Sequence, residues 1–241
     1  MTVKSNAFRD GLKDGIPICL GYLAVSFAFG IQAVSSGLTV FQATLISLSN
    51  LTSAGQFAGL GVIAASGSLL EMAGVQFIIN LRYMLMSAAI SQKLSPDVST
   101  LKRMGIAFGM TDEVFGISAA RPGHLEPAYS AGAIIIATFG WTLGTFLGAY
   151  SGEILPAGLI SALGVALYGM FIAIVIPVAR DDKNIMLTAL AAMLMSAAFT
   201  FLPYLNRISS GFRIIIVTVV TAGVAAALFP VSETEEGAVC E

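Results

Sequence analysis

Polar residues interrupt a hydrophobic stretch that is long enough to cross a bilayer. The interruption runs from Ser47 to Gln56, SLSNLTSAGQ, and includes Asn50 and Ser53. Lipid offers no water to backbone or polar groups, so such a break persists only where it is buried in protein or lines a cavity. Asn50, Ser53 and Gln56 could therefore bind the polar ends of a small solute. The alternative is a kink inside an ordinary packed helix, whose freed backbone groups bond to Ser and Thr hydroxyls.

Two adjacent acids, Asp112 and Glu113, lie at the centre of a second apolar stretch, GMTDEVFG. A carboxylate at membrane depth is costly, and it either finds a cation or loads and releases a proton. Neighbouring helical residues point about 100° apart, so we expect only one of the two to face a cavity. A capping role is equally compatible with the pattern, with Thr111 or Asp112 as the N-cap of a half-helix and Glu113 in its first turn.

A polar stripe runs along a third stretch otherwise built of Ile, Leu and Met. Its members recur at steps of three or four residues and are Gln76, Asn80, Tyr83, Ser87 and Ser91. Such a stripe must face protein or water, either to make interhelical hydrogen bonds or to line a pathway. Arg82 lies about 200° around the helix from Asn80. We expect Arg82 to pair with an acid or to extend towards the cytoplasm, and Asn80 and Arg82 join the candidate binding residues.

The composition indicates an integral membrane protein. Of 241 residues, 56% are apolar and only 11% are charged, and the net charge of -2 gives no sign of nucleic-acid binding. Spans and short connections use nearly the whole length, which leaves no room for an ATP-binding domain. Cys19 and Cys240 are not expected to pair. No metal-ligand, nucleotide-binding or hydrolase motif is present, so we expect no metal, no cofactor and no enzyme activity.

Eight hydrophobic segments make up the predicted all-α fold. They are Ile16 to Val34, Gln42 to Ala64, Leu69 to Ile90, Met104 to Ala120, Ala128 to Ala149, Leu159 to Val178, Ile185 to Leu205 and Phe212 to Phe229. The second and fourth carry the polar interruptions and are predicted to be discontinuous. Four glycines follow at steps of four, Gly140, Gly144, Gly148 and Gly152, and predict a close packing seam on the fifth segment.

Loop charges favour six full spans with two re-entrant segments, the second entering from outside and the fourth from the cytoplasm. Cytoplasmic loops collect Lys and Arg. In this arrangement nine basic residues lie inside, namely Lys4, Arg9, Lys13, Lys93, Lys102, Arg103, Arg121, Arg180 and Lys183. Only Arg207 and Arg213 lie outside. Seven or eight spans are the alternatives. Residues 1-14 are then a cytoplasmic segment, 15-230 a single transmembrane transport domain, and 231-241 an acidic tail.

Several short motifs together resemble the AzlC family of branched-chain amino acid exporters. They are Phe8-Arg9-Asp10-Gly11, Gly15-Ile16-Pro17, Gly21, Phe29-Gly30, SNLTSAGQFA, Asn80-Leu81-Arg82, Leu85-Met86 and Thr111-Asp112-Glu113-Val114-Phe115. The resemblance implies a bacterial inner-membrane permease that exports valine, leucine and isoleucine, with methionine or toxic analogues as further substrates. It also implies a small hydrophobic AzlD-like partner subunit. It assigns no binding residue.

The combined prediction is a multi-pass secondary transporter subunit for branched-chain or other small neutral amino acids, driven by a proton or other ion gradient. Asn50, Ser53 and Gln56 would bind the solute's polar ends. Asp112 or Glu113 would carry a coupling proton or hold the ammonium, with Arg82 beside it. Two alternatives come from other classes: a non-transporting scaffold for a partner permease, and a channel for small solutes.

Overall fold

The computed structural model describes residues 2–152 and 182–230, together with positions 158, 172, 176, 177, 179 and 180. The predicted segment Leu159 to Val178 therefore lies largely outside the described residues. Apart from turns and one isolated bridge between Leu94 and Leu125, the described chain is helical. The all-α prediction is confirmed.

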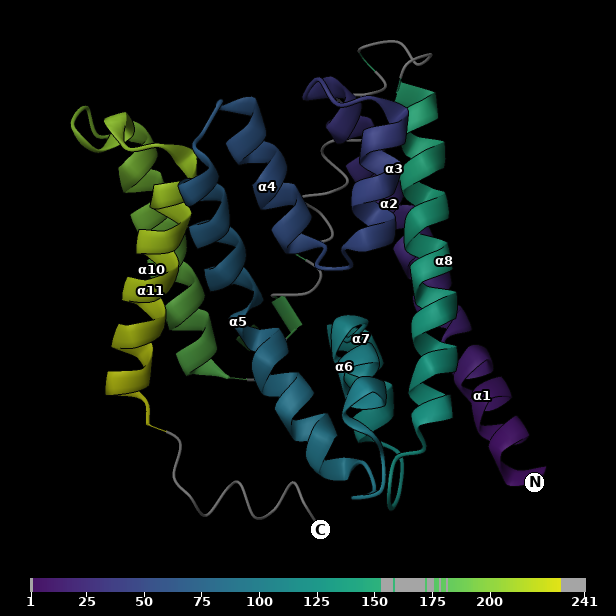
Figure 1. Cartoon of the computed structure of the whole chain (residues 1–241). Coiled ribbons are helices and arrows are strands. Elements are labelled where there is room, and N and C mark those ends of the chain that lie inside the picture. Colours follow the sequence, from purple (N-terminus) through teal and green to yellow (C-terminus); the bar gives the residue numbers. More distant parts are fainter. Residues whose placement is uncertain are drawn as a thin grey trace.

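The helices follow the predicted hydrophobic segments closely (Figure 1). Their bounds are α1 Thr2–Asp14, α2 Ile16–Ser35, α3 Val40–Ser49, α4 Ala54–Ala64, α5 Leu69–Lys93, α6 Thr100–Phe108, α7 Asp112–Ala119, α8 Pro127–Gly152, α10 Lys183–Phe201, the 3-10 turn η1 Leu205–Arg207 and α11 Ser210–Leu228. Five of the described helices, α2, α5, α8, α10 and α11, are long and apolar enough to cross a membrane. The amphipathic helix α1 was not predicted.

The second predicted segment is two short helices joined by a break. α3 has 10 residues and α4 has 11, so each rises about 15 Å, half of a hydrocarbon core of about 30 Å. Both helices lie in the upper half of Figure 1, and the chain turns back between them. A capping box between Thr39 and Gln42 starts α3.

The fourth predicted segment is also a hairpin, inserted from the opposite end. α6 has 9 residues and α7 has 8, and both lie in the lower half of Figure 1. The Thr111 hydroxyl caps α7 by accepting a hydrogen bond from the Val114 N–H at 3.3 Å. Both segments are therefore discontinuous and re-entrant, as predicted, and neither crosses the molecule as the seven- and eight-span alternatives require.

The glycine seam of α8 packs directly against α2. A Cβ built on Gly140, Gly144 or Gly148 would overlap main-chain atoms of α2, around Cys19, Leu23 and Phe27 respectively. The same applies at Gly132, which lies against the main chain of α1 near Phe8. The absence of side chains lets these helices approach closely, and it makes α2 and α8 the packed centre of the described fold.

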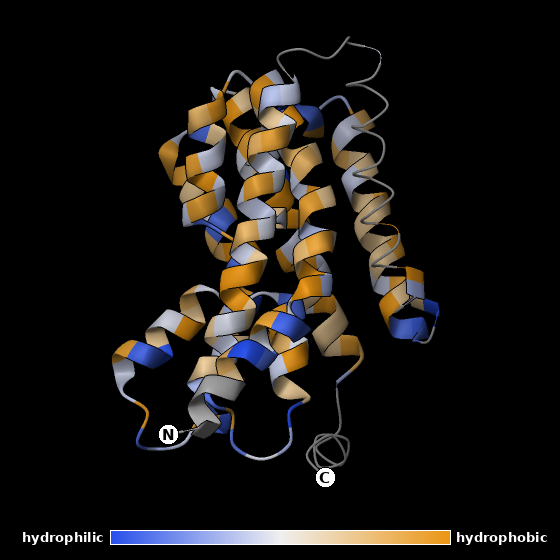
Figure 2. Cartoon of the chain, turned by 90° about the vertical axis from the view of Figure 1, so that its right-hand side faces the viewer, coloured by the Kyte–Doolittle hydropathy of each residue, from blue (hydrophilic) through white to orange (hydrophobic). Residues whose placement is uncertain are grey.

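Basic residues gather at the end of the molecule that carries the N-terminus. Lys93 ends α5 there, Lys102 and Arg103 lie in the first turn of α6, and Arg121 follows α7, whereas Arg207 and Arg213 lie at the other end (Figures 1 and 2). Figure 2 shows hydrophobic residues along the height of the long helices. By the excess of Lys and Arg, the end with the N-terminus is the predicted cytoplasmic side.

Candidate functional site

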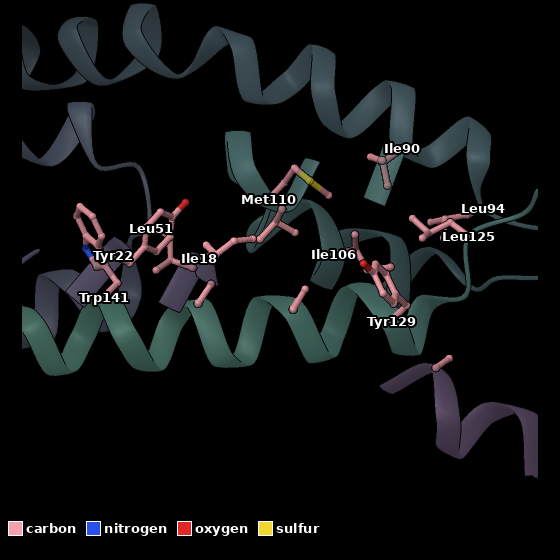
Figure 3. Close-up of a cluster of buried hydrophobic side chains, with 14 residues drawn as sticks. Ile18, Tyr22, Leu51, Ile90, Leu94, Ile106, Met110, Leu125, Tyr129 and Trp141 are labelled. Carbon is pink, nitrogen blue, oxygen red and sulfur yellow. The ribbon is translucent and has the colours of Figure 1, made fainter. Parts of the chain in front are cut away.

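The tips of the two hairpins meet over α2 and α8. Leu51, from the break between α3 and α4, and Met110, from the break between α6 and α7, are both buried in one apolar cluster. Figure 3 shows their side chains together with Ile18, Tyr22 and Trp141. The rings of Tyr22 and Trp141 meet edge to face, with centroids 5.3 Å apart. Two breaks that are far apart in the sequence therefore form a single region.

Asn50 and Ser53 shape the first break. The Asn50 side-chain oxygen accepts a hydrogen bond from the Thr52 N–H at 3.0 Å, which stabilises the turn after α3. Ser53 is the N-cap of α4, and its hydroxyl accepts from the Ala54 N–H at 2.7 Å. Its φ of 36° lies in the left-handed region, at a cost of about 1–3 kcal/mol. Strain of this kind is typical of positions fixed by their surroundings.

Gln56 attaches the first hairpin to α8. Its side-chain Nε2 donates to the Ser47 hydroxyl at 3.2 Å, and that hydroxyl lies 2.7 Å from the Thr145 hydroxyl. All three residues are buried. The structure therefore places one predicted binding residue among contacts with α3 and α8, while the Gln56 carbonyl oxygen, Oε1, keeps no hydrogen-bond partner.

The polar stripe of α5 faces α4 through its first two members. Gln76 Nε2 donates to the Gly55 carbonyl at 2.7 Å, and Asn80 Nδ2 donates to Gln76 Oε1 at 3.1 Å. Farther along the helix, the Ser91 hydroxyl accepts from Arg103 of α6 at 2.9 Å. Interhelical hydrogen bonding therefore accounts for much of the stripe.

Arg82 and Tyr83 of α5 join the two breaks. Arg82 forms an ion pair with Asp112, with 2.5 Å between Nη1 and Oδ2, and donates to the Tyr83 hydroxyl at 3.0 Å. The Tyr83 hydroxyl in turn reaches the Thr52 carbonyl at 3.4 Å. The Arg82 and Asp112 side chains keep 42% and 48% of their surface exposed, so the pair stays open to a ligand.

Asp112 and Glu113 point to different helices. Asp112 faces Arg82 of α5, whereas Glu113 accepts a hydrogen bond from the Tyr22 hydroxyl of α2. The divergence follows from their adjacent positions on a helix. Asp112 therefore has a cation beside it, whereas Glu113 is hydrogen-bonded to the neutral phenol of Tyr22.

Buried polar atoms without a partner gather around the first break. Within the described residues, Thr52 Oγ1, Gln56 Oε1 and Asn80 Oδ1 are buried there and make no hydrogen bond. The other such atoms lie outside the break and are Trp141 Nε1, Thr142 Oγ1 and Ser210 Oγ. Buried polar groups are nearly always satisfied, so each exception needs an explanation. A bound ligand or ordered water supplies one. Sequence reasoning missed Tyr22 and Trp141, because an aromatic residue within an apolar span carries no distinguishing signal.

Glu71 is a further acid that the sequence reasoning missed. It is 4% exposed and lies in the first turn of α5. Its Oε1 accepts from the Ser209 hydroxyl at 2.6 Å and from the Gly211 N–H at 2.8 Å, so it caps α11 from a neighbouring helix. Its partners Ser209 and Gly211 are distant in the sequence, so no local motif indicates this contact.

A separate cavity of about 770 Å³ lies between α6 and α8 at the end with the N-terminus. Its lining includes Lys102, Ile106, Glu126 and Ala131, and none of the predicted site residues. Across the described part of the chain, no three His, Cys, Asp or Glu residues lie close enough to hold a metal ion. The predicted site residues Arg82 and Asp112 lie instead where the two breaks meet.

A family of membrane proteins matches this chain. The family model described as AzlC protein matches residues 17–155, more than half of the chain and both broken segments. The chain belongs to the AzlC family. Inner membrane protein YgaZ of Escherichia coli is 29% identical over 77% of this chain and 78% of its own length. A membrane protein of Archaeoglobus fulgidus is 34% identical over 72% of this chain and 77% of its own.

A membrane protein of Helicobacter pylori is also similar, at 26% identity over 61% of this chain and 65% of its own length. No solved structure matches. The relatives are named as membrane proteins, and the five long apolar helices agree with a multi-pass membrane protein.

Proposed function

We propose that this AzlC-family protein is a secondary transporter subunit that exports branched-chain or other small neutral amino acids across the bacterial inner membrane. The observation that carries the proposal is the Arg82–Asp112 pair. It lies where two re-entrant hairpins meet, and nearly half of each side chain is exposed. Helix breaks at membrane depth are the usual binding region of secondary transporters.

An amino acid zwitterion matches this pair in charge. The guanidinium of Arg82 would hold the carboxylate, since its planar donors suit bidentate binding of carboxylates. Asp112 would hold the ammonium. A zwitterion inserted between Arg82 and Asp112 breaks their ion pair and forms two new ones, Arg82 with the carboxylate and Asp112 with the ammonium. Each charge therefore keeps a partner in a medium of low dielectric constant. Asn50 and Ser53, which shape the adjacent break, place the Thr52 backbone beside Arg82 through Tyr83.

The apolar side chain of the substrate would lie near Leu51 and Met110. Both belong to the buried cluster between the hairpin tips. Methionine adapts to ligands of different shape. Each methylene in such a pocket is worth only about 1–3 kcal/mol, so discrimination among valine, leucine, isoleucine and methionine would be weak.

Glu113 is the proposed site of proton coupling. The Arg82 guanidinium keeps Asp112 in an ion pair, whereas the recorded partner of Glu113 is the Tyr22 hydroxyl. A carboxyl group without a cation at membrane depth can hold a proton in one state of a cycle and release it in another. Transport would then draw on an ion gradient, without a cofactor.

A small AzlD-like subunit is the proposed partner in the bilayer. If the chain were only a scaffold for that partner, it would not bind amino acids when purified alone. If it were a channel, its flux would exceed carrier rates and would not respond to a pH gradient.

Counterflow of labelled leucine in proteoliposomes tests the proposed function, with and without the small subunit. We expect Arg82→Met to lower counterflow at least about tenfold, because a hydrogen bond to a charged group is lost. Arg207→Met is the matched control: this arginine is exposed at the other end of the molecule, and its removal should leave counterflow unchanged.

Competition separates the two ends of the substrate. Unlabelled leucine should compete, whereas leucinamide and 4-methyl-2-oxopentanoate, which lack the carboxylate and the ammonium respectively, should compete poorly. Equal counterflow in Arg82→Met and wild type, or equal competition by all three compounds, would remove the substrate from this pair.

A further inference from the structure

Three side-chain oxygens converge on the face of Gly55 in the first turn of α4. Thr52 Oγ1, Gln76 Oε1 and Asn80 Oδ1 lie 2.6, 2.9 and 3.1 Å from the position that a Cβ on Gly55 would occupy. Thr52 and Gly55 belong to the break region, and the other two residues come from α5. Only a glycine leaves this face open to the three oxygens.

The hydrogen bonds fix which atoms of the two amides are oxygens. The Gly55 carbonyl can only accept, so the atom of Gln76 at 2.7 Å from it must be Nε2. Gln76 Oε1 then accepts from Asn80 Nδ2 at 3.1 Å, which leaves Asn80 Oδ1 facing the cluster. Flipping Gln76 would break both bonds, and flipping Asn80 would break the second. The convergence of oxygens is therefore set by the backbone of α4.

Two of the three oxygens lack a partner. Thr52 Oγ1 and Asn80 Oδ1 are buried without any hydrogen bond, and Gln76 Oε1 has only its bond from Asn80. Amide and hydroxyl oxygens are ligands of hard cations. The three contacts supply no carboxylate, which favours a single positive charge over a divalent ion.

The burial of these oxygens favours a compact ion as their ligand. The unpartnered atoms of Thr52 and Asn80 have almost no accessible surface, so an amino acid with its substituents does not reach them directly. The carboxyl end of α3 and the Thr52 carbonyl favour positive charge in the break, while the amino end of α4 opposes it.

We propose that Thr52, Gln76 and Asn80 form a sodium site at the first break. The Thr52 carbonyl is 3.4 Å from the Tyr83 hydroxyl, which accepts from Arg82 of the substrate pair. Sodium would therefore order the same turn on which Arg82 depends. This inference rests on the proposed function only for the role of sodium as a coupling ion; binding of the ion itself does not require transport.

Thermal unfolding of the purified full chain in detergent tests the site without any amino acid. Chloride salts of sodium, potassium and N-methyl-D-glucamine are compared at constant ionic strength. A ligand of the folded state raises the unfolding temperature with its concentration. We expect a saturable rise with sodium and none with the organic cation. An unfolding temperature that does not respond to sodium would overturn the proposal.

Variants locate the effect. Thr52→Val and Asn80→Leu each remove one oxygen and should weaken the apparent sodium affinity at least about tenfold. Gly55→Ala, which places a methyl group against all three oxygens, should abolish it. The matched control is Thr142→Val, because Thr142 Oγ1 is also buried and unpartnered but lies on α8. Sodium dependence that is equal in Thr52→Val, Asn80→Leu and wild type would place the ion elsewhere.

Equilibrium binding of radioactive sodium to wild type separates the ion from the substrate's own ammonium group, and it needs no variant to fold. Leucine should leave sodium bound or increase its binding. Displacement of sodium by leucine but not by 4-methyl-2-oxopentanoate would instead assign the oxygens to the ammonium. Sodium binding without leucine counterflow would support the sodium site and reject the proposed transport. Leucine counterflow without sodium binding would support the transport and reject the sodium site.

Discussion

Asp112 and Glu113 are neighbours in the chain with different chemical surroundings. Asp112 has the Arg82 guanidinium at 2.5 Å, while Glu113 is hydrogen-bonded by Tyr22. A nearby cation favours the ionised form of a carboxyl group, and a phenol contributes no positive charge. The two acids should therefore be separable by experiment, with Asp112 in substrate binding and Glu113 in proton coupling.

Replacing Glu113 with Gln should remove the pH dependence of transport while leaving amino acid binding largely intact. The amide keeps the size of the side chain and a hydrogen bond with Tyr22, but it cannot exchange a proton. Asp112→Asn should instead weaken binding and keep a pH response. The measurement is leucine counterflow across a pH series, with binding assayed in parallel. A wild-type pH profile in Glu113→Gln would contradict proton coupling through this residue.

The Arg82–Asp112 pair should also contribute to stability. Asp112→Asn leaves a guanidinium without its counter-charge, and we expect a loss of about 1.5–3 kcal/mol in the free energy of unfolding, near the lower value because the pair is half exposed. Arg82→Gln should cost a similar amount. In the double variant the loss should be smaller than the sum, by about 0.5–3 kcal/mol. Strict additivity in detergent unfolding would mean that the pair does not hold the breaks together.

The sequence predicted the two helix breaks better than the contacts that each residue makes there. Polar residues inside a span identify a break, because lipid penalises them wherever they lie. Whether a side chain binds a ligand or stabilises the turn depends on its direction, which the pattern leaves open. Asn50 and Ser53 bond to neighbouring backbone N–H groups. Thr52, two positions from Asn50, has the unpartnered hydroxyl instead.

At the scale of elements, the seam between α2 and α8 gives the hairpins a rigid base. Gln56 of α4 reaches the Ser47–Thr145 hydroxyl pair, and Tyr22 of α2 reaches Glu113 of α7. Both hairpins are therefore attached to the same two packed helices. A change in the α2–α8 distance would move both hairpins.

Gly148→Ala should destabilise the protein by about 1–3 kcal/mol, because the new methyl group would overlap main-chain atoms of Phe27 and the helices would have to separate. The matched control is Gly223→Ala in α11, where a Cβ would meet nothing within 4 Å. There we expect no loss, or a gain of up to about 1 kcal/mol from helix propensity. Unfolding in detergent measures both. Equal stability of the two variants would contradict the close seam.

Helix boundaries were predictable where a long apolar stretch defined them. α2, α5, α8 and α11 lie within a few residues of the predicted segments. α1 was missed because Thr2–Asp14 is mostly polar, and its close approach to α8 at Gly132 is a tertiary contact. The cap that Glu71 provides to α11 was missed for the same reason, since its partners are 138 and 140 positions away.

From α2 to α8, the chain repeats one motif in opposite orientations. A long helix, a short hairpin and a second long helix occur as α2, α3–α4 and α5, and again as α5, α6–α7 and α8 (Figure 1). The first hairpin enters from one end and the second from the other. Inverted arrangements of this kind suit alternating access, because movement of either hairpin opens the shared site to its own side. The Tyr83 and Arg82 contacts would then have to break and reform during transport.

The orientation of the hairpins predicts which pairs of connections share a side of the membrane. Single Cys residues can be placed at Ser36 and Ala65, on either side of the first hairpin, and at Ser99 and His124, on either side of the second. The background would carry Cys19→Ala and Cys240→Ala. Because each hairpin returns to the end it entered, the members of each pair should react alike with a membrane-impermeant thiol reagent.

In intact cells we expect Ser36→Cys and Ala65→Cys to be labelled from outside, and Ser99→Cys and His124→Cys to be labelled only after the membrane is opened, since Lys and Arg are concentrated in the connections of the second pair. The two pairs test different statements. If one member of a pair were labelled from outside and the other were not, its hairpin would cross the bilayer. The two breaks would then lie apart, and the proposed site would not exist. Matching labels within each pair, but with inside and outside exchanged, would keep the site and reverse the orientation, so that Lys93, Lys102 and Arg121 would lie outside, against the charge rule.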